Sequence, residues 1–298
     1  FRAYSFFDPK NTPLAVGVVL ALIFAAAIFG GSRQISQITG VLVPVMGIFY
    51  LAVSLFIVVT HYQAIPQMFA DIFGNAFDLQ AIFGGFAGSC VMHGIKRGLF
   101  SNEAGVGSAP NAAASAAVSH PVKQGLVQML SVFIDTILIC SATAFMLLCS
   151  GVAPGADLAG MPWVQAAASN SLGGFGTIFI TIALCLFAFT TLIGNFYYAE
   201  MGLKFLCGRK PGKALINAFR VIAALIVLVG ATMEFGLVWN MADVLMGLMA
   251  LINLPVILIL GGPAIRAMKD YMKQKKEGKD PVFRARDIEL RDKTDFWN

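Results

Sequence analysis

The sequence predicts a polytopic α-helical membrane protein, and three observations support this fold class. Of its 298 residues, 58% are hydrophobic and only 12% are charged, whereas soluble domains usually carry about 25% charged residues. The mean hydropathy is +0.77. Charge-free runs are long, and the longest extends from Leu158 to Ala199. Such runs suit helices that cross a bilayer, each of which needs about 20 apolar residues.

Apolar runs bounded by charged residues, glycine or proline predict about seven membrane-spanning helices. They are Leu14–Gly31, Ile35–Val59, Ala81–Phe100, Gln124–Ser150, Gly174–Gly202, Ala214–Met233 and Gly236–Gly262. The mixed segment Gln63–Phe77 is expected to be an interfacial helix or a loop, and Met161–Asn170 a short surface helix. We therefore expect a membrane domain over residues 1–262. Residues 263–298 should form a charged tail, with a short amphipathic helix at the membrane surface and then a flexible end.

Basic residues alternate between the connections and predict the orientation. The connections after the first, third and fifth spans contain Lys or Arg, among them Lys96 and Arg97, and the tail contains ten. The intervening connections contain none. The positive-inside rule places the basic side and the C-terminus in the cytoplasm. Trp239 then lies near an outer boundary, where tryptophan is common. The pI near 9.0 is thus a topology signal and gives no reason to expect a nucleic-acid partner.

The third span is rich in glycine, with Gly84, Gly85 and Gly88 close together. Glycine costs about 1 kcal/mol relative to alanine inside a helix. Small residues also permit close helix packing in membranes. Two interpretations stay open: a packing surface, or a broken helix whose freed backbone groups line a cavity.

The fifth span carries paired hydroxyls, Thr190 and Thr191, with Asn195 one turn further on. A hydroxyl in a membrane helix often bonds back to its own backbone. Alternatively, the two hydroxyls and a carbonyl such as that of Phe187 supply oxygen ligands for sodium, because hard cations prefer oxygen. A second, broken helix would then complete the shell.

Asp135 and Asp243 lie inside predicted spans, where an ionisable side chain indicates a functional site by default. Each is as well explained by helix–helix hydrogen bonding. As proton relays they would define a proton-coupled transporter. A membrane-embedded enzyme is a second possible function. It would need a cluster of catalytic or metal-binding side chains, but the three histidines lie near span ends and do not cluster. A channel is a further possibility without a supporting motif.

The stretch "GIKRGLFSNEAGVGSAPNAAASAAVSHPVKQGLVQMLSVFIDT" (Gly94–Thr136) resembles the alanine or glycine:cation symporter family, the bacterial sodium:alanine symporters. "FAFTTLIGNFYYAE" and "ADVLMGLMALINLPVILIL" are also similar to that family. The resemblance implies a leucine-transporter-type fold of inverted repeats, of which this chain would hold core helices four to ten. The chain begins at Phe1 without a methionine, and we expect it to be part of a longer protein and inactive in transport alone.

The resemblance also implies roles for particular residues. The function would be sodium-coupled symport of a small neutral amino acid, alanine or glycine, across the bacterial inner membrane, without catalysis. The third span would be the unwound core helix. The implied substrate residues are Gly84, Gly85, Phe86, Gly88 and Asn195, and the implied Na⁺ ligands are Phe187, Thr190 and Thr191.

The segment Gly98–Pro110 would follow the cytoplasmic end of the broken helix, with Lys96 and Arg97 at the inner interface. Polar side chains such as Asn102 and Glu103 can satisfy helix-end backbone groups. Gly105 and Gly107 permit tight turns. We expect either a hinge that moves as the inward gate opens or a rigid connecting turn.

Overall fold

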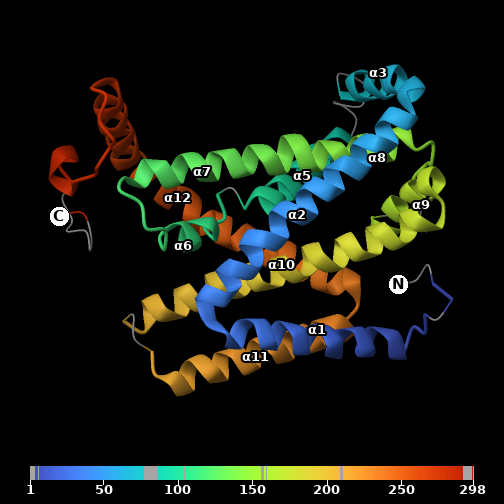
Figure 1. Cartoon of the computed structure of the whole chain (residues 1–298), viewed down its shortest axis with the longest axis horizontal. Helices are drawn as coiled ribbons and strands as arrows, with labels where there is room; N and C mark the ends of the chain where they lie inside the picture. Colours follow the sequence, from blue (N-terminus) through green and yellow to red (C-terminus); the bar gives the residue numbers. More distant parts are fainter. Residues whose placement is uncertain are drawn as a thin grey trace. The chain divides into compact units, whose positions relative to one another are not determined.

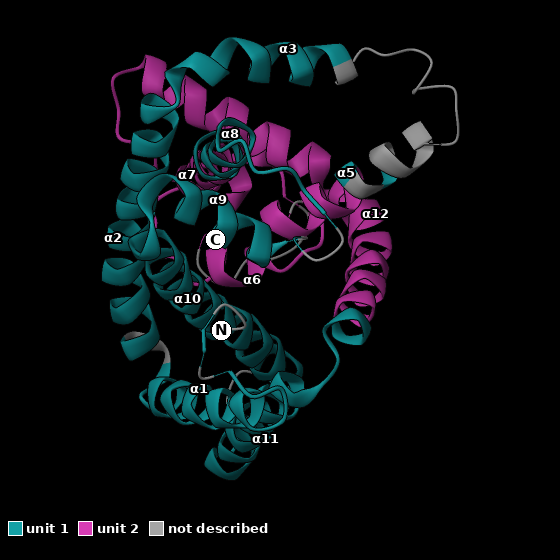
Figure 2. Ribbon diagram, turned by 90° about the vertical axis from the view of Figure 1, so that its right-hand side faces the viewer, with its two compact units in different colours: residues 1–94, 136–238 teal, residues 95–135, 239–298 magenta. Residues whose placement is uncertain are grey.

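The computed structural model describes residues 4–5, 7–76, 86–103, 105–155, 158, 160–208, 211–290 and 297. The described residues form helices and connecting segments, with no β-strand among them (Figure 1). The chain divides into two compact units (Figure 2). Unit 1 comprises residues 1–94 and 136–238, and unit 2 comprises residues 95–135 and 239–298.

Six stretches of helix in the described part of the chain are long and apolar enough to cross a membrane. They correspond to α1 (Asn11–Phe29), α2 (Gly31–Thr60), α7 with α8 (Pro121–Phe133 and Ser141–Cys149), α10 (Gly174–Leu206), α11 (Lys213–Thr232) and α12 (Phe235–Lys276). The predicted polytopic α-helical class is confirmed. The third predicted span continues as α5 (Phe86–Asn102), and its earlier part lies outside the described residues.

The shorter helices lie between the long ones, except the last, which follows α12. They are a 3₁₀ turn at Tyr62–Ala64, α3 (Ile65–Ala76), α6 (Ala109–Ala113), α9 (Met161–Leu172) and a 3₁₀ turn at Ala285–Ile288. A helix or a loop was expected at the position of α3, and a short helix at the position of α9. One face of α9 is buried, at Val164, Ala167 and Ala168, and packs against α10.

Unit 1 is held together by two apolar clusters. Helices α1 and α11 lie side by side, and α10 packs against α2 and α9 (Figures 1 and 2). The first cluster joins α2, α8, α9 and α10 through Tyr50, Ile57, Met146, Val164, Ala168, Phe179, Ile180 and Ala183. The second joins α1, α2 and α10 through Phe24, Ala27, Ile28, Ile35, Ile193 and Phe196, with α11 packed against it.

Large apolar side chains also cover the outside of the long helices. Ile48 on α2 is 70% exposed, Ile226 on α11 64% and Leu258 on α12 82%. An apolar surface this extensive is rare on a soluble protein. The surface therefore matches a lipid environment, in which these side chains face hydrocarbon.

A π-helical turn, Ile134–Cys140, joins α7 to α8. Asp135 is the acidic residue of its first turn. The boundary between the two units falls between Asp135 and Thr136. One continuous span thus contributes its first part to unit 2 and its second part to unit 1.

In unit 2, α12 extends well beyond the predicted end of the last span at Gly262, and ends at Lys276. Pro263 lies inside this helix, and proline is a usual cause of helix bending. The last part of α12 runs across the direction of α7 instead of along it (Figures 1 and 2). The predicted boundary at residue 263 therefore falls inside one helix.

The tail after α12 folds back onto unit 2. Phe283, Ala285 and Ile288 are buried against Val122 of α7 and Tyr271 of α12. The expected flexible end is wrong for residues 281–290. Its apolar residues, spaced among charges, were too few to be recognised as a packed segment in the sequence.

Candidate functional site

The expected sodium ligands lie on α10, in the middle of its charge-free run. Thr190 is buried, and its hydroxyl donates to the carbonyls of Leu186, at 3.1 Å, and Phe187, at 3.0 Å. This hydrogen bond from a hydroxyl to the backbone of its own helix is one of the two interpretations of Thr190 that the sequence allowed. The hydroxyl oxygen keeps its lone pairs while it donates its hydrogen, so the same geometry leaves an oxygen ligand available.

The other residues of this group occupy a neighbouring face of α10. Thr191 and Asn195, four residues apart, are both exposed, and Phe187 is half-buried. Residues four apart on a helix share a face. The structure thus brings Thr190 together with the Phe187 carbonyl, and it places Thr191 and Asn195 on an open face of the helix.

The expected helix break is only partly described. Gly84 and Gly85 lie outside the described residues. Phe86 and Gly88 belong to the first turn of α5, whose described part begins at Phe86. The break and the substrate residues therefore stay predictions.

The connection after α5 has a defined polar structure. Helix α5 ends at Asn102, and Glu103 follows with φ of 50°, a left-handed value uncommon for residues other than glycine. The Ser108 hydroxyl donates to the Glu103 carboxylate over 2.7 Å. The Val106 amide donates to the Glu103 carbonyl. Glu103 thus organises the turn through both its backbone and its side chain.

The two glycines of this connection lie against Asn253 in the middle of α12. Gly105 and Gly107 have φ of 83° and 94°, values that favour glycine. The Asn253 amide donates to the Gly105 carbonyl over 3.0 Å. A Cβ at Gly107 would lie 2.9 Å from Asn253 Cγ. The turn therefore requires glycine for its conformation and for its close approach to α12.

Arg97 of α5 pairs with Asp243 of α12, which sequence reasoning missed. Its Nη2 donates to both carboxylate oxygens, at 2.6 and 2.8 Å, and its guanidinium lies 4.9 Å from the Trp239 ring centroid. Lys96 Nζ is 3.8 Å from Asp243. Arg97 therefore lies beside the first turns of α12, near the tryptophan assigned to an outer boundary. Because Arg97 contacts Trp239, the predictions that place Arg97 at the inner interface and Trp239 near an outer boundary cannot both hold.

Asp135, the other carboxylate within a span, accepts a hydrogen bond from the Ser101 hydroxyl over 2.7 Å. Both expected relay carboxylates thus make contacts between segments far apart in sequence. No group of three or more His, Cys, Asp or Glu side chains able to hold a metal ion occurs among the described residues.

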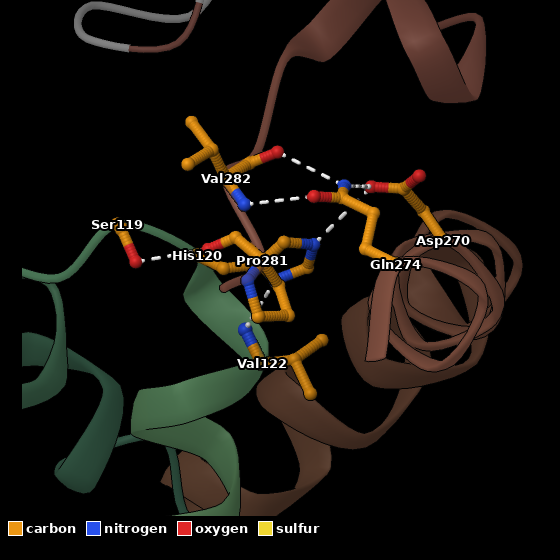
Figure 3. Close-up of polar contacts among 7 residues, drawn as sticks. All are labelled: Ser119, His120, Val122, Asp270, Gln274, Pro281 and Val282. Atoms are coloured by element: carbon orange, nitrogen blue, oxygen red, sulfur yellow. Dashed lines mark hydrogen bonds and ion pairs between the residues drawn. The ribbon is translucent and has the colours of Figure 1, made fainter. Parts of the chain in front are cut away.

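His120, at the start of α7, is fully buried and was not recognised from sequence. Its Nδ1 accepts from the Val122 amide over 3.2 Å, and its Nε2 lies 3.4 Å from Asp270 (Figure 3). Its ring packs edge-on against Tyr271 and Phe283. Burial lowers the pKa of His120 below its usual value, and Asp270 partly opposes that shift. His120 is thus a neutral helix cap that anchors the tail.

Glu200 is a second buried polar residue that the sequence analysis did not single out. It is 2% exposed, on α10, and pairs with Lys204 one turn later. Arg220 of α11 approaches its other oxygen, at 3.5 Å. This cluster joins two long helices in unit 1. An acidic residue in an apolar run, followed by a basic residue four positions later, is the signal that could have revealed it.

Long apolar helices, lipid-exposed side chains and oxygen donors inside a charge-free span define a polytopic α-helical membrane protein. The chain belongs to the sodium:alanine symporter family, whose sequence profile matches residues 3–285. The family resemblance seen in the sequence is therefore confirmed.

Three curated relatives come from Bacillus subtilis. The amino-acid carrier protein AlsT is 44% identical over 284 residues, which cover 95% of this chain and 60% of AlsT. The probable sodium/glutamine symporter GlnT is 42% identical over 91% of this chain and 56% of its own length. The putative sodium/proton-dependent alanine carrier YrbD is 40% identical over 96% and 62%.

The chain therefore spans about three fifths of the length of these relatives, with coverage of 60%, 56% and 62%. The family and these relatives are transporters, not enzymes. This result excludes the membrane-embedded enzyme that the sequence analysis kept as an alternative.

Proposed function

We propose that the complete protein containing this chain is a sodium-coupled symporter of a small neutral amino acid, alanine or glycine. The observation that carries this proposal is the family match over residues 3–285. The back-bonded Thr190 beside the Phe187 carbonyl supports it, because a charge-free helix there offers oxygen atoms and no competing positive charge.

In this proposal Na⁺ binds at Thr190, Thr191 and the Phe187 carbonyl, with further ligands from a broken helix. The amino acid binds at Gly84, Gly85, Phe86 and Gly88, with Asn195 nearby. Bound sodium stabilises the conformation that holds the amino acid, and coupling is the resulting difference in affinity between outward and inward states. Binding at discontinuous helices near the midplane permits alternating access, as in the leucine-transporter-type fold that we propose.

Proton coupling is the alternative, and the name of the relative YrbD, a putative sodium/proton-dependent carrier, favours testing it. Within this chain Asp243 is engaged by Arg97 and Asp135 by Ser101. We therefore assign both carboxylates to helix–helix contacts and sodium to the coupling role.

Uptake of labelled alanine by the complete protein in proteoliposomes tests the proposed function. We expect uptake to require a sodium gradient and to persist when a protonophore collapses the pH gradient. Uptake that is independent of sodium and abolished by the protonophore would establish proton coupling. Competition by unlabelled glycine and glutamine would define the substrate, since the relative GlnT is named for glutamine.

Single substitutions test the sodium ligands. Thr190→Ala and Thr191→Ala should each raise the sodium concentration for half-maximal uptake by about tenfold, which corresponds to about 1.4 kcal/mol of lost binding. Thr190→Ser keeps the hydroxyl and is the matched control, with an expected change under threefold. An unchanged sodium dependence in both alanine variants would contradict the assignment.

We also propose a bacterial inner-membrane location with the C-terminus in the cytoplasm, from the alternation of basic connections. A fluorescent reporter fused after Asn298 should be active only if that end is cytoplasmic, whereas a periplasmic phosphatase reporter should be inactive there. The opposite pattern would reverse the orientation.

The connection at Asn102, Glu103, Gly105 and Gly107 is proposed as a hinge, with a rigid turn as its alternative. The Asn253–Gly105 hydrogen bond must then break or move with α12. Spin labels at Asn102 and Leu251 in the complete protein distinguish the two. A distance that changes when sodium and alanine are added supports the hinge, and a constant distance supports the rigid turn.

A further inference from the structure

The last part of α12, from Pro263 to Lys276, has two faces of different character. One face is covered by the tail of the same chain, with Ala267 and Tyr271 buried. The Gln274 amide joins this face to the tail, since it donates to the Val282 carbonyl and accepts from the Val282 amide (Figure 3). Arg266 donates to the Ile288 carbonyl. This face therefore already has its partner.

The opposite face is open and combines apolar with basic side chains. Ile265, Met268 and Met272 are 59%, 37% and 49% exposed, and their spacing of three and seven residues places them in one stripe. Lys269, Lys273 and Lys276 lie along the same side, where they line a shallow surface depression with the two methionines and Glu277. We call these six residues from Ile265 to Lys276 the basic face.

The charge of this segment is strongly positive. Residues 263–277 contain Arg266, Lys269, Lys273, Lys275 and Lys276 against the acidic Asp270 and Glu277. Asp270 is held on the covered side by Gln274. The basic face thus presents three lysines beside an apolar stripe, with one carboxylate at its end.

The direction of this segment relative to α7 is that expected of a helix lying along a membrane surface. It follows directly from the apolar part of α12, and α7 begins a span within the same unit. Because the segment runs across α7 (Figures 1 and 2), it is parallel to the bilayer plane when α7 crosses the bilayer. A helix in that position with an apolar stripe and flanking lysines has the character of an interfacial helix.

We propose that the basic face binds the anionic phospholipid headgroups of the membrane that α12 crosses. The methionines and Ile265 enter the boundary between headgroups and acyl chains, and the lysines extend their ammonium groups to lipid phosphates. Charge complementarity and continuity with the span favour lipid over a protein partner. The tail supports this arrangement because it covers the apolar side of the segment formed by Ala267 and Tyr271.

A spin label at position 272 tests the proposal. The probe is Met272→Cys in the full chain, with the five native cysteines replaced by alanine or serine, in nanodiscs of phosphatidylcholine with or without phosphatidylglycerol. Collisions with oxygen report contact with lipid, and collisions with a water-soluble nickel chelate report contact with water. We expect the label to become lipid-accessible and water-protected when phosphatidylglycerol is present.

A charge-removal variant and a matched control complete the test. The variant Lys269→Gln/Lys273→Gln/Lys276→Gln should lose the response to phosphatidylglycerol. The control Lys10→Gln/Lys213→Gln/Lys279→Gln removes as much charge from exposed positions elsewhere and should keep it. All variants are checked by size-exclusion chromatography.

Two results would overturn the proposal. One is equal access of the nickel chelate to the label in both lipid compositions. The other is protection that persists without anionic lipid and rises with protein concentration, which would show that a second copy of the chain covers the face.

Discussion

The two units of the molecule differ in how much of their described packing is apolar. Unit 1 has two apolar clusters that join its long helices, with a polar cluster at Glu200. In unit 2, ion pairs and hydrogen bonds connect segments more than a hundred residues apart, such as Arg97–Asp243 and Asn253–Gly105. The apolar cluster found among the described residues of unit 2 is formed with the tail.

The difference follows from the medium. In lipid, burying an apolar side chain between helices gains mainly packing, because the hydrocarbon outside is equally apolar. Apolar contacts between helices then favour close packing without strongly selecting one set of helix neighbours. A charge or an amide in a span, by contrast, requires a particular partner. We therefore expect single polar residues to matter most in unit 2, and packed apolar residues to matter most in unit 1.

The largest expected effect is at Arg97. Arg97→Leu removes the guanidinium nitrogen that donates to both oxygens of Asp243, leaves Lys96 at 3.8 Å, and should destabilise the protein by about 3 kcal/mol. The measurement is chemical unfolding in detergent micelles. The double variant Arg97→Leu/Asp243→Leu removes both charges and should recover most of the loss. If Arg97→Leu is neutral, the ion pair is not what holds unit 2 together.

A cavity in unit 1 should cost somewhat less. Ile180 is 1% exposed within the first apolar cluster, and Ile180→Ala should cost about 2.5 kcal/mol. Ile182→Ala, on an exposed part of the same helix, is the control and should change stability by less than about 0.5 kcal/mol. Equal costs at the two positions would remove the distinction between packed and lipid-facing sides of α10.

Gly107 tests the turn against α12. Gly107→Ala places a Cβ in a left-handed conformation and against Asn253, for a cost of about 2 kcal/mol. Gly98→Ala, inside α5 with open space around the new Cβ, should be neutral or slightly stabilising. Thermal unfolding of both variants in one detergent makes the comparison, and a neutral Gly107→Ala would show that the turn adapts easily.

The smallest effect is expected at His120. His120→Asn keeps a side-chain acceptor for the Val122 amide but removes the ring contacts with Tyr271 and Phe283, for about 1 kcal/mol. The loss should be local to the tail. Hydrogen exchange of the Phe283 amide, which donates to the Ser119 carbonyl, is the readout, and slower exchange in the variant would contradict the anchoring role.

The pH dependence of the same contact has a defined sign. Because burial lowers the pKa of His120, the unfolded chain takes up a proton at higher pH than the folded one. Stability from this residue is therefore complete above the unfolded pKa, near 6.5, and is lost as pH falls below it. Protection of the Phe283 amide should decrease from pH 7 to pH 5.5 in the natural chain and change less in His120→Asn.

The sequence predicted the features that depend on local composition. Charge-free runs located the long helices, and the symporter motif identified the family. The partners of Arg97, His120 and Asn253 could not be predicted, because each lies far away in sequence and a single chain gives no register between helices. The sequence also did not show that the helix continues past Gly262, because Pro263 lies inside α12 without ending it.

The π-helical turn between α7 and α8 has a consequence for insertions and deletions in this span. A helix turns about 100° per residue, so removing one residue from Ile134–Cys140 would rotate everything after it by that angle relative to what precedes. The deletion would then preserve the Ser101–Asp135 hydrogen bond and break the Tyr50–Thr143 hydrogen bond, or the reverse. The π-helical turn sets the rotation between the part of the span that carries Asp135 and the part that carries Thr143. We therefore expect the number of residues in this turn to be as constrained as their identity.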